Sequence, residues 1–314
     1  MPPALSPSRA GDFMQCPLLY RFRVVDRLPE TPSPAAARGT LVHAVLERLF
    51  DLPAHRRTVE EAGALLPSTW RELVEERPEL DDLIARDVPV ASGGESAATA
   101  DDPEAVAGAS SEVVDTPGEP TLPGRDAWFD AALRLVERWF TLEDPTRLEP
   151  AERELYVETD LDGLLLRGYV DRIDIAPDGR MRVVDYKTGR SPSPLFEGRA
   201  LFQMKFYALV LWRLHGRVPT RLQLVYLGNG ELLTYEPDEA DLLAVERKVK
   251  ALWAAIERAA STGDFRARPS RLCDWCDHRA LCPAWGGTPP PLPDSAAELA
   301  LDPAASGRVE VAVD

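Results

Sequence analysis

The spacing of apolar residues divides this chain into a helical first part and a later part in which strands and helices alternate. Apolar residues recur at helical intervals in 38–50 and 125–143, and 58–77 is predicted to form another helix. Ser6 followed by Pro7 is typical of a helix N-cap, so a short helix is predicted to begin there.

Strand patterns begin at about residue 151. The predicted strands are 151–159, 163–176, 180–187, 221–227 and 231–235, and the predicted helices among them are 195–215 and 237–261. Strands and helices that alternate after a helical N-terminal half predict an α/β fold. The chain has 314 residues, of which 45% are hydrophobic, which is enough for one large domain with a sizeable core.

The most informative stretch is 168–190, in which two strand patterns flank a Pro-Asp-Gly turn centred on Asp178. Proline at the first turn position and glycine at the last favour a three-residue loop closed by a left-handed glycine. In that register Asp171 lies opposite Asp185 on the neighbouring strand. A two-residue turn would shift the register by one and place the two aspartates on opposite faces of the sheet. The proline favours the first interpretation.

Lys187 lies two residues beyond Asp185, so its side chain is expected on the same face, about 7 Å further along the strand. Two opposed carboxylates repel each other, and a hard divalent cation would relieve that repulsion. A cation can activate water and polarise a phosphate oxygen, while a nearby ammonium orients the water or stabilises charge. This set fits the hydrolysis of a phosphodiester. The alternative is a surface hairpin with ordinary charges, because Asp-x-Lys is a common tripeptide.

The chain has four cysteines, which are Cys16 and the close triplet Cys273, Cys276 and Cys282. In a reducing cytosol this layout suggests a metal site before disulfides. Four thiolates suit a [4Fe–4S] cluster as well as zinc, and His278 could replace one cysteine around zinc. Free cysteines are the third alternative.

The formal net charge of −16 opposes binding to phosphates, but the acidic residues are concentrated in two stretches. Residues 81–122 contain ten acidic residues against Arg86 alone, and 286–314 contain five against Arg308 alone. The rest of the chain is close to neutral and leaves room for a basic groove. Residues 88–122 of the first stretch have almost no large apolar side chains and are predicted to be a disordered insertion, and the Pro-rich second stretch is predicted to be a loose tail.

Some familiar signals are missing from the sequence. No apolar run is long enough to span a membrane, and the first residues lack the apolar core of a secretion signal, so a cytoplasmic protein is expected. The chain also lacks the glycine-rich P-loop of nucleotide-driven motors. If the protein works with a helicase, we expect the motor to be a separate subunit.

The string GYVDRID…VVDYKTG resembles the active-site core of the RecB-like nucleases in the PD-(D/E)xK superfamily. The strings LVHAVLE and FQMKFYALVLW extend the resemblance, which covers about residues 4–52 and 125–285. It implies a restriction-endonuclease-like core, in which a central mixed sheet is flanked by helices. The acidic insertion is not part of the pattern.

The resemblance also implies roles for individual residues. The implied ligands of Mg²⁺ or Mn²⁺ are His43, Asp171, Asp185 and the backbone carbonyl of Tyr186. The imidazole shifts the expected preference toward Mn²⁺, because nitrogen is a softer ligand than oxygen. Lys187 would position or activate the attacking water. Gln203 and Tyr207 lie one helical turn apart, so both can face the site and contact substrate or support Lys187.

The cysteine layout resembles that of the AddB-type and CRISPR-adaptation branches of the same nucleases. There, one distant N-terminal cysteine and a C-x2-C-x5-C triplet hold a [4Fe–4S] cluster. The resemblance therefore implies a cluster bound by Cys16, Cys273, Cys276 and Cys282, which would tie the two ends of the chain together. Closing so long a loop restricts the unfolded chain.

The expected organisation follows from these patterns. It consists of a helical N-terminal part with Cys16 and His43 at 1–80, a disordered acidic insertion at 81–124, a nuclease core at 125–262, a cysteine region at 263–285 and a flexible tail at 286–314. The expected function is metal-dependent hydrolysis of DNA, acting as an exonuclease on single-stranded ends in recombination and repair. The alternatives are endonucleolytic trimming in CRISPR adaptation and a non-catalytic module that binds DNA ends. The intact Asp171, Asp185 and Lys187 argue against the last.

Overall fold

The computed structural model of the protein describes residues 2–84, 124–193 and 197–301. Most of the predicted acidic insertion and the last residues of the predicted tail lie outside these ranges. Among the described residues, none of the helices is both long and apolar enough to cross a membrane.

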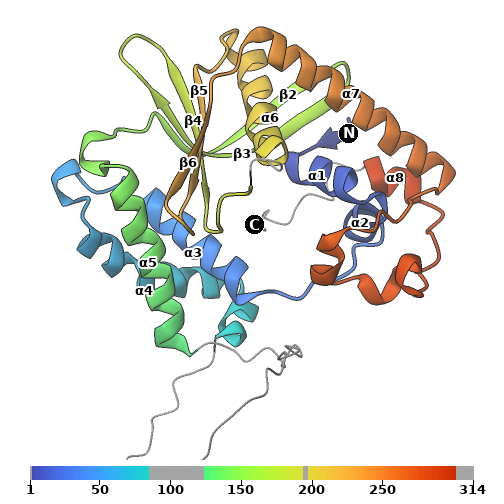
Figure 1. The fold of residues 1–314 in the computed structure, drawn as a ribbon, viewed down its shortest axis with the longest axis horizontal. Helices are drawn as coiled ribbons and strands as arrows, with labels where there is room; N and C mark the ends of the chain where they lie inside the picture. The colour runs from blue at the N-terminus through green and yellow to red at the C-terminus, as the bar shows by residue number, and fades with distance from the viewer. Residues whose placement is uncertain (1, 85–123, 194–196, 302–314) are drawn as a thin grey trace, which may run out of the picture.

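One mixed sheet forms the centre of the fold (Figure 1). Its strands are β1 (Ala4–Leu5), β2 (Glu152–Leu161), β3 (Leu164–Ile175), β4 (Met181–Lys187), β5 (Arg221–Tyr226) and β6 (Glu231–Tyr235). The order is β1-β3-β4-β5-β6, and β2 pairs with β3 as an antiparallel ribbon that extends away from β4, β5 and β6. The β1–β3 and β4–β5 pairs are parallel, and the remaining pairs are antiparallel. The predicted mixed sheet is therefore confirmed.

The register of the β3–β4 hairpin is the one that the Pro-Asp-Gly turn predicts. Ile173 pairs with Val183, and the backbone of Ala176 hydrogen-bonds to Arg180 across the loop, at 2.9 Å from N to O. Gly179 has a φ of 82°, the left-handed conformation that closes such a loop. Asp171 and Asp185 therefore lie at the end of the hairpin that is opposite the turn.

The helices cover the two faces of the sheet (Figure 1). They are α1 (Pro7–Gln15), α2 (Pro17–Tyr20), α3 (Pro34–Leu49), α4 (Val59–Glu76), α5 (Arg125–Leu142), α6 (Glu197–His215), α7 (Glu239–Thr262) and α8 (Ala296–Leu301). A π-helical turn continues α2 at Arg21–Val25, and short 3₁₀ helices lie at Ala54–Arg56, Pro78–Leu83, Pro145–Arg147, Arg271–Trp275, Arg279–Leu281 and Pro283–Trp285. Ser6 caps α1 as predicted, because its side chain accepts a hydrogen bond from the Arg9 N–H.

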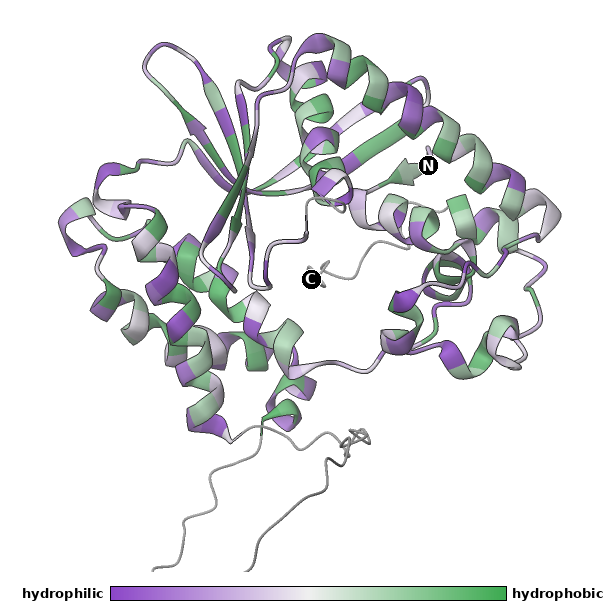
Figure 2. Ribbon diagram, in the orientation of Figure 1, coloured by the Kyte–Doolittle hydropathy of each residue, from purple (hydrophilic) through white to green (hydrophobic). Residues whose placement is uncertain are grey.

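Two apolar cores lie on opposite sides of the strands, and the green segments of Figure 2 follow the inward faces of the helices. One core joins α3, α4 and α5 to residues of β4 and β5 such as Val184 and Val225. The other joins α1, α6, α7 and α8 to the β2–β3 ribbon and to the remaining residues of the central strands. The catalytic candidates lie where these two halves meet.

The described part of the predicted tail contains one short helix, α8, that packs against the rest of the fold. Ala296 and Ala300 on α8 are buried, and the Tyr20 hydroxyl donates a hydrogen bond to the Ala300 carbonyl at 2.7 Å. Alanine gives a weak apolar signal in the sequence, but small side chains allow a short helix to lie close against α2 and α7. The C-terminal segment therefore packs against the N-terminal one.

Candidate active site

The candidate site lies where strands β3 and β4 separate. Their ladder ends at Arg172 and Val184, and Asp171 follows at the point of separation. The Asp171 Oδ2 atom accepts a hydrogen bond from the Tyr186 backbone N–H at 2.7 Å. The predicted register is thus present, but Asp171 and Asp185 do not form a ladder pair. The carboxylate of Asp171 contacts the backbone of β4 instead.

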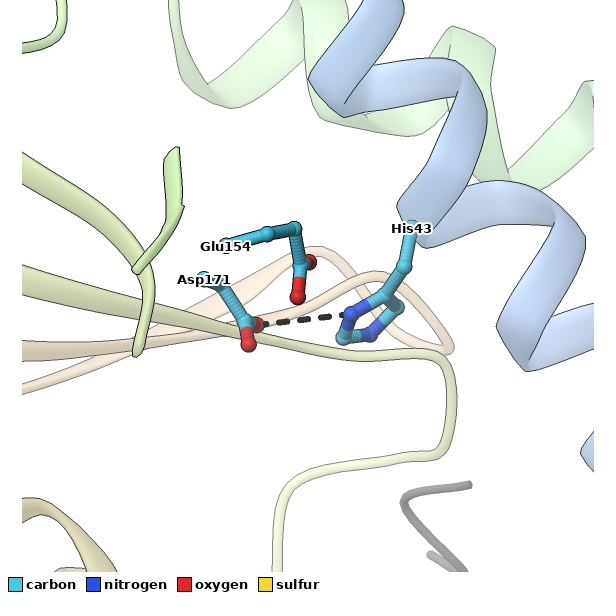
Figure 3. Close-up of side chains that lie close together, drawn as sticks. All are labelled: His43, Glu154 and Asp171. Carbon is cyan, nitrogen blue, oxygen red and sulfur yellow. Dashed lines mark ion pairs between the residues drawn. The ribbon is translucent and has the colours of Figure 1, made fainter. Parts of the chain in front are cut away.

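A first group of side chains consists of His43, Glu154 and Asp171 (Figure 3). One potential ligand atom from each lies within 4.8 Å of those of the other two. His43 comes from the middle of α3, and its Nδ1 atom is 3.5 Å from Asp171 Oδ2. Glu154 comes from β2, opposite Asp171 in the β2–β3 register. This spacing suits a single cation with an imidazole and two carboxylates around it.

Sequence analysis missed Glu154. The signal was available, because a tight turn between the predicted strands at 151–159 and 163–176 aligns Glu154 with Asp171. Glu154 has a φ of 44°, which is unusual for a residue other than glycine and aims its side chain out of the regular pleat. Burial raises the pKa of Glu154 to about 7, with a further contribution from the charge of Asp171.

A second group links Asp185, Lys187, Gln203 and Tyr207. Lys187 Nζ lies 3.1 Å from Asp185 Oδ2 and donates a hydrogen bond to Gln203 Oε1 at 3.1 Å. The amide nitrogen of Gln203 donates to Asp185 Oδ1 at 3.0 Å and lies 3.4 Å from the Tyr207 hydroxyl oxygen. Gln203 therefore bridges the Asp185 carboxylate and the Lys187 ammonium. Because Gln203 belongs to α6, this helix fixes the position of both groups.

Gly168 makes room for this second group. A Cβ atom at this position would lie 2.7 Å from Cε1 of Tyr207, closer than real Cβ contacts occur. The absence of a side chain on β3 therefore lets the tyrosine ring lie directly against the strand. The glycine of the GYVDRID string has a packing role that places Tyr207 beside Gln203.

Electrostatic repulsion connects the two groups. Asp185 is 3% exposed, and burial raises its pKa to about 7, although Lys187 acts in the opposite direction. The charge of Asp171 raises the pKa of both Asp185 and Glu154. Asp185 Oδ2 is buried and, among the described residues, lacks a hydrogen bond of good geometry, although Lys187 is close to it. Three carboxylates held this way fit a divalent cation, which would favour their ionised forms.

A buried ion-pair network lies directly behind the site. Arg172 is 1% exposed, and its two terminal nitrogens donate to Glu143 at 2.7 and 2.8 Å. Its guanidinium also donates to the Tyr186 hydroxyl, and its remaining nitrogen lies 3.2 Å from Asp174. Arg172 and Tyr186 each follow one of the paired aspartates in the chain, so this network anchors both strands at the site.

The four cysteines line one cavity at the opposite end of the molecule from α4. Cys16, at the junction of α1 and α2, meets Cys273, Cys276 and Cys282 there. Burial raises the pKa of the Cys276 thiol, with further contributions from the other three cysteines. Backbone N–H groups of Arg268 and Ser270 point at the sulfurs of Cys16 and Cys273, at 3.4 and 3.3 Å. Such donors stabilise thiolates.

Other residues near the cysteines have their own partners. His278 is buried against the Phe22 ring, and its Nε2 atom is 3.2 Å from Glu30, so the histidine is engaged away from the sulfurs. Several arginines near the cysteines in the sequence form ion pairs with acidic residues as well. The arginine pairs are Arg21–Asp26, Arg23–Asp12, Arg266–Asp264 and Arg279–Asp274.

Comparison with known proteins found similarity to proteins of mycobacterial phages and to solved structures. The chain is 26% identical to the Gene 69 protein of Mycobacterium phage D29 over 300 residues, which cover 90% of this chain and 97% of the phage protein. It is 27% identical to the Gene 69 protein of Mycobacterium phage L5 over 173 residues, which cover 52% and 54% of the two chains. One of the solved structures, described as a candidate exonuclease of Eubacterium rectale, shares 14% identity and a TM-score of 0.49, over 88% of this chain and 87% of that one.

The family comparison covers most of the chain. The model described as the PD-(D/E)XK nuclease superfamily matches residues 4–283, a range that contains both groups of the site and the four cysteines. A mixed sheet flanked by helices, with paired acids and a lysine at the separation of two strands, accords with that match. This chain belongs to the PD-(D/E)XK nuclease superfamily.

Proposed function

We propose that this chain is a metal-dependent DNA nuclease of the RecB type, an exonuclease that hydrolyses single-stranded ends during recombination and repair. The observation that carries the proposal is the convergence of Asp171, Asp185 and Lys187 on the separation of β3 and β4. The acids repel each other there, and Lys187, Gln203 and the more distant His43 compensate Asp185 only in part, because its pKa stays raised. Buried carboxylates that repel each other destabilise a fold, whereas a bound cation with a phosphate would compensate their charge. The site therefore suits ligand binding better than a structural role.

The proposed cation ligands are His43, Glu154, Asp171 and Asp185, with the carbonyl of Tyr186. The first three already have ligand atoms within 4.8 Å of one another. The N–H and C=O of one strand residue point to the same edge of the strand, so the Tyr186 carbonyl is directed like its N–H, toward Asp171. A bound Mg²⁺ or Mn²⁺ would polarise a phosphate oxygen and lower the pKa of a water.

Lys187 and its partners carry the remaining chemistry in this proposal. The Lys187 ammonium donates to Gln203 and lies beside Asp185, which leaves it oriented toward the same carboxylate that binds the cation. From this position it can orient an attacking water or stabilise charge on the reacting phosphate. Gln203 and Tyr207 hold the ammonium in place from α6.

We also propose a [4Fe–4S] cluster in the cysteine cavity. Four sulfurs around one zinc ion would lie about 3.8 Å apart. Among the described residues, no three cysteine sulfurs lie within 4.8 Å of one another, and His278 is engaged with Glu30. The wider spacing suits a larger inorganic group bound by Cys16, Cys273, Cys276 and Cys282.

The test is cleavage of labelled single-stranded DNA by the purified full chain. Reactions with Mn²⁺ or Mg²⁺ are compared with reactions in a chelator, and linear DNA is compared with circular DNA, duplex and RNA of the same sequence. We expect metal-dependent loss of nucleotides from linear single strands and no cleavage of circles. Cleavage of circular DNA would instead support the alternative function, an endonuclease of the CRISPR-adaptation kind.

The matched variants are Asp185→Asn at the site and Asp178→Asn on the exposed hairpin turn. The first is expected to abolish cleavage. The second is expected to leave it unchanged, because Asp178 lies at the surface and its side chain, within the described part of the chain, pairs with Arg180. Equal cleavage by wild type and Asp185→Asn would reject the site. Binding of DNA ends without cleavage by the wild type would support a non-catalytic module instead.

A further inference from the structure

Two exposed tyrosines face each other across the β2–β3 ribbon. Tyr156 and Tyr169 are direct partners in the antiparallel register, and their side chains are 45% and 54% exposed. Their ring centroids are 5.3 Å apart at an angle of 58° between the planes. The Tyr156 hydroxyl donates to Glu158 at 2.6 Å, which fixes the orientation of that ring.

The tyrosine pair lies on the same face of the ribbon as the acidic pair of the site. Asp171 is two residues from Tyr169 along β3, and strand side chains alternate between faces. Glu154, whose φ of 44° breaks this alternation on β2, has a ligand atom within 4.8 Å of one from Asp171. The side chain between Tyr169 and Asp171 on β3, that of Val170, is buried and points into the core. The tyrosines therefore form the next row of the acidic face, about 7 Å from the site.

Packing accounts for the contact between the two rings but not for their exposure. An aromatic pair across two strands stabilises a ribbon by its own contact. Most of the larger aromatic side chains of the described chain, such as Trp70, Trp128 and Trp139, are nevertheless buried. Tyr156 and Tyr169 present two adjacent aromatic surfaces to solvent beside a site for phosphate chemistry.

We propose that Tyr156 and Tyr169 form a stacking platform for an unpaired nucleobase of the strand whose phosphate lies at the His43–Glu154–Asp171 group. This inference rests on the proposed nuclease function and names how the substrate is held. The row spacing of about 7 Å corresponds to about two nucleotides of a stacked strand. Arg167 occupies the following row of the same face, opposite Glu158, and adds a positive group in the direction of the strand.

Stacking on aromatic rings is independent of base identity, because each base has a π-face. It requires the base to be free of a complementary strand on that side. The platform therefore selects single-stranded nucleic acid near the cleaved bond and sets no sequence preference. A substrate that lacks the base at this position loses the stacking contact, whereas a substrate with a different base there keeps it.

The experiment uses oligonucleotides that carry one abasic residue at successive positions from the labelled end. Wild type with Mn²⁺ is expected to cleave more slowly, by at least about fivefold, when the abasic residue occupies one position near the cleaved bond. The double variant Tyr156→Ala with Tyr169→Ala is expected to lose this position dependence and to show a raised KM with little change in kcat. The double variant with phenylalanine at both positions is expected to behave as wild type.

Two controls separate stacking from a structural role. Ile175→Ala removes another exposed apolar side chain of β3, beside the hairpin turn, and should not alter the abasic dependence. Thermal unfolding of the double alanine variant reports any loss of ribbon stability, and the phenylalanine variant keeps the ring contact. If wild type cleaves equally fast at each abasic position, the platform is rejected while the nuclease stands.

The same oligonucleotides distinguish failure of the platform from failure of the nuclease. If wild type cleaves none of them, the proposed function fails, and binding is measured without metal by fluorescence anisotropy. An abasic-sensitive affinity that the double alanine variant loses would then still support the platform. Equal affinities for both proteins would reject it.

Discussion

The backbone N–H of Tyr186 donates to the carboxylate of Asp171 at 2.7 Å, across the separation of β3 and β4. This bond replaces the ladder that would otherwise continue between the strands, and it ties the acid of one strand to the backbone of the other. The carboxylate of Asp171 thus has a structural function as well as its proposed place around a cation.

The two functions of Asp171 can be separated by two substitutions. Asp171→Asn keeps an oxygen that can accept the Tyr186 N–H but removes the charge, so stability should be retained while metal affinity falls. Asp171→Ala removes both and leaves a buried donor without its partner, which costs about 1–3 kcal/mol. Chemical unfolding and metal titration by calorimetry measure the two effects. Equal losses of stability in both variants would contradict this assignment.

Asp185 is expected to make the metal-free protein less stable as the pH rises. Its pKa is raised from 3.8 to about 7, so between those values the folded protein keeps a proton that the unfolded chain has released. Stability therefore falls as the pH rises through this window, and below it the cost disappears. Asp185→Asn should gain stability relative to wild type from low to neutral pH, as measured by urea unfolding in chelator. A constant difference between the two proteins across that range would contradict the prediction.

Gln203 is predicted to act by positioning. Gln203→Ala removes the bridge between Lys187 and Asp185 and should lower the rate of cleavage by about 10- to 100-fold, as loss of a supporting hydrogen-bond partner commonly does. Gln203→Glu keeps an acceptor for Lys187 but adds a fourth negative charge, so its pH profile should shift toward higher pH. An unchanged pH profile of cleavage in Gln203→Glu, together with wild-type cleavage rates in Gln203→Ala, would show that Gln203 has no positioning role.

Arg172 is predicted to be a stability determinant behind the site. Arg172→Met leaves buried Glu143 without its main partner and should destabilise the protein by about 3–5 kcal/mol. Arg180→Met breaks an ion pair on the exposed turn and serves as the control, with little change expected. Denaturant unfolding compares the two variants. A similar small effect in both would show that the buried network contributes little.

Cys16→Ser is predicted to abolish the cluster although three cysteines remain. Anaerobic purification followed by iron and sulfide determination should find a cluster in wild type and little or none in the variant. Leu272→Ala changes an exposed side chain near the triplet and should retain the cluster. A colourless wild-type protein that contains zinc would overturn the iron–sulfur assignment.

Short-range sequence patterns were enough to predict the part of the site that lies on the β3–β4 hairpin. The Pro-Asp-Gly turn was enough to predict the register of β3 and β4, because Pro177 and Gly179 together favour the three-residue loop. Glu154 was missed because its position depends on a second pairing, between β2 and β3, and on a φ of 44° that side-chain alternation does not anticipate. The burial of Ala300 depends on a surface built by distant helices, which no local pattern describes.

The cavity shared by Cys16 and the C-terminal triplet has a consequence for the order of events during synthesis. Cys273, Cys276 and Cys282 are translated only after the strands of the sheet and α6, so the nascent chain lacks three of the four thiols of this cavity until those elements have been made. A nascent chain can build its sheet but cannot yet hold an inorganic group at this position. If the proposed cluster is bound here, we expect its insertion to follow translation of the triplet, and a chain that ends before Cys273 should bind none.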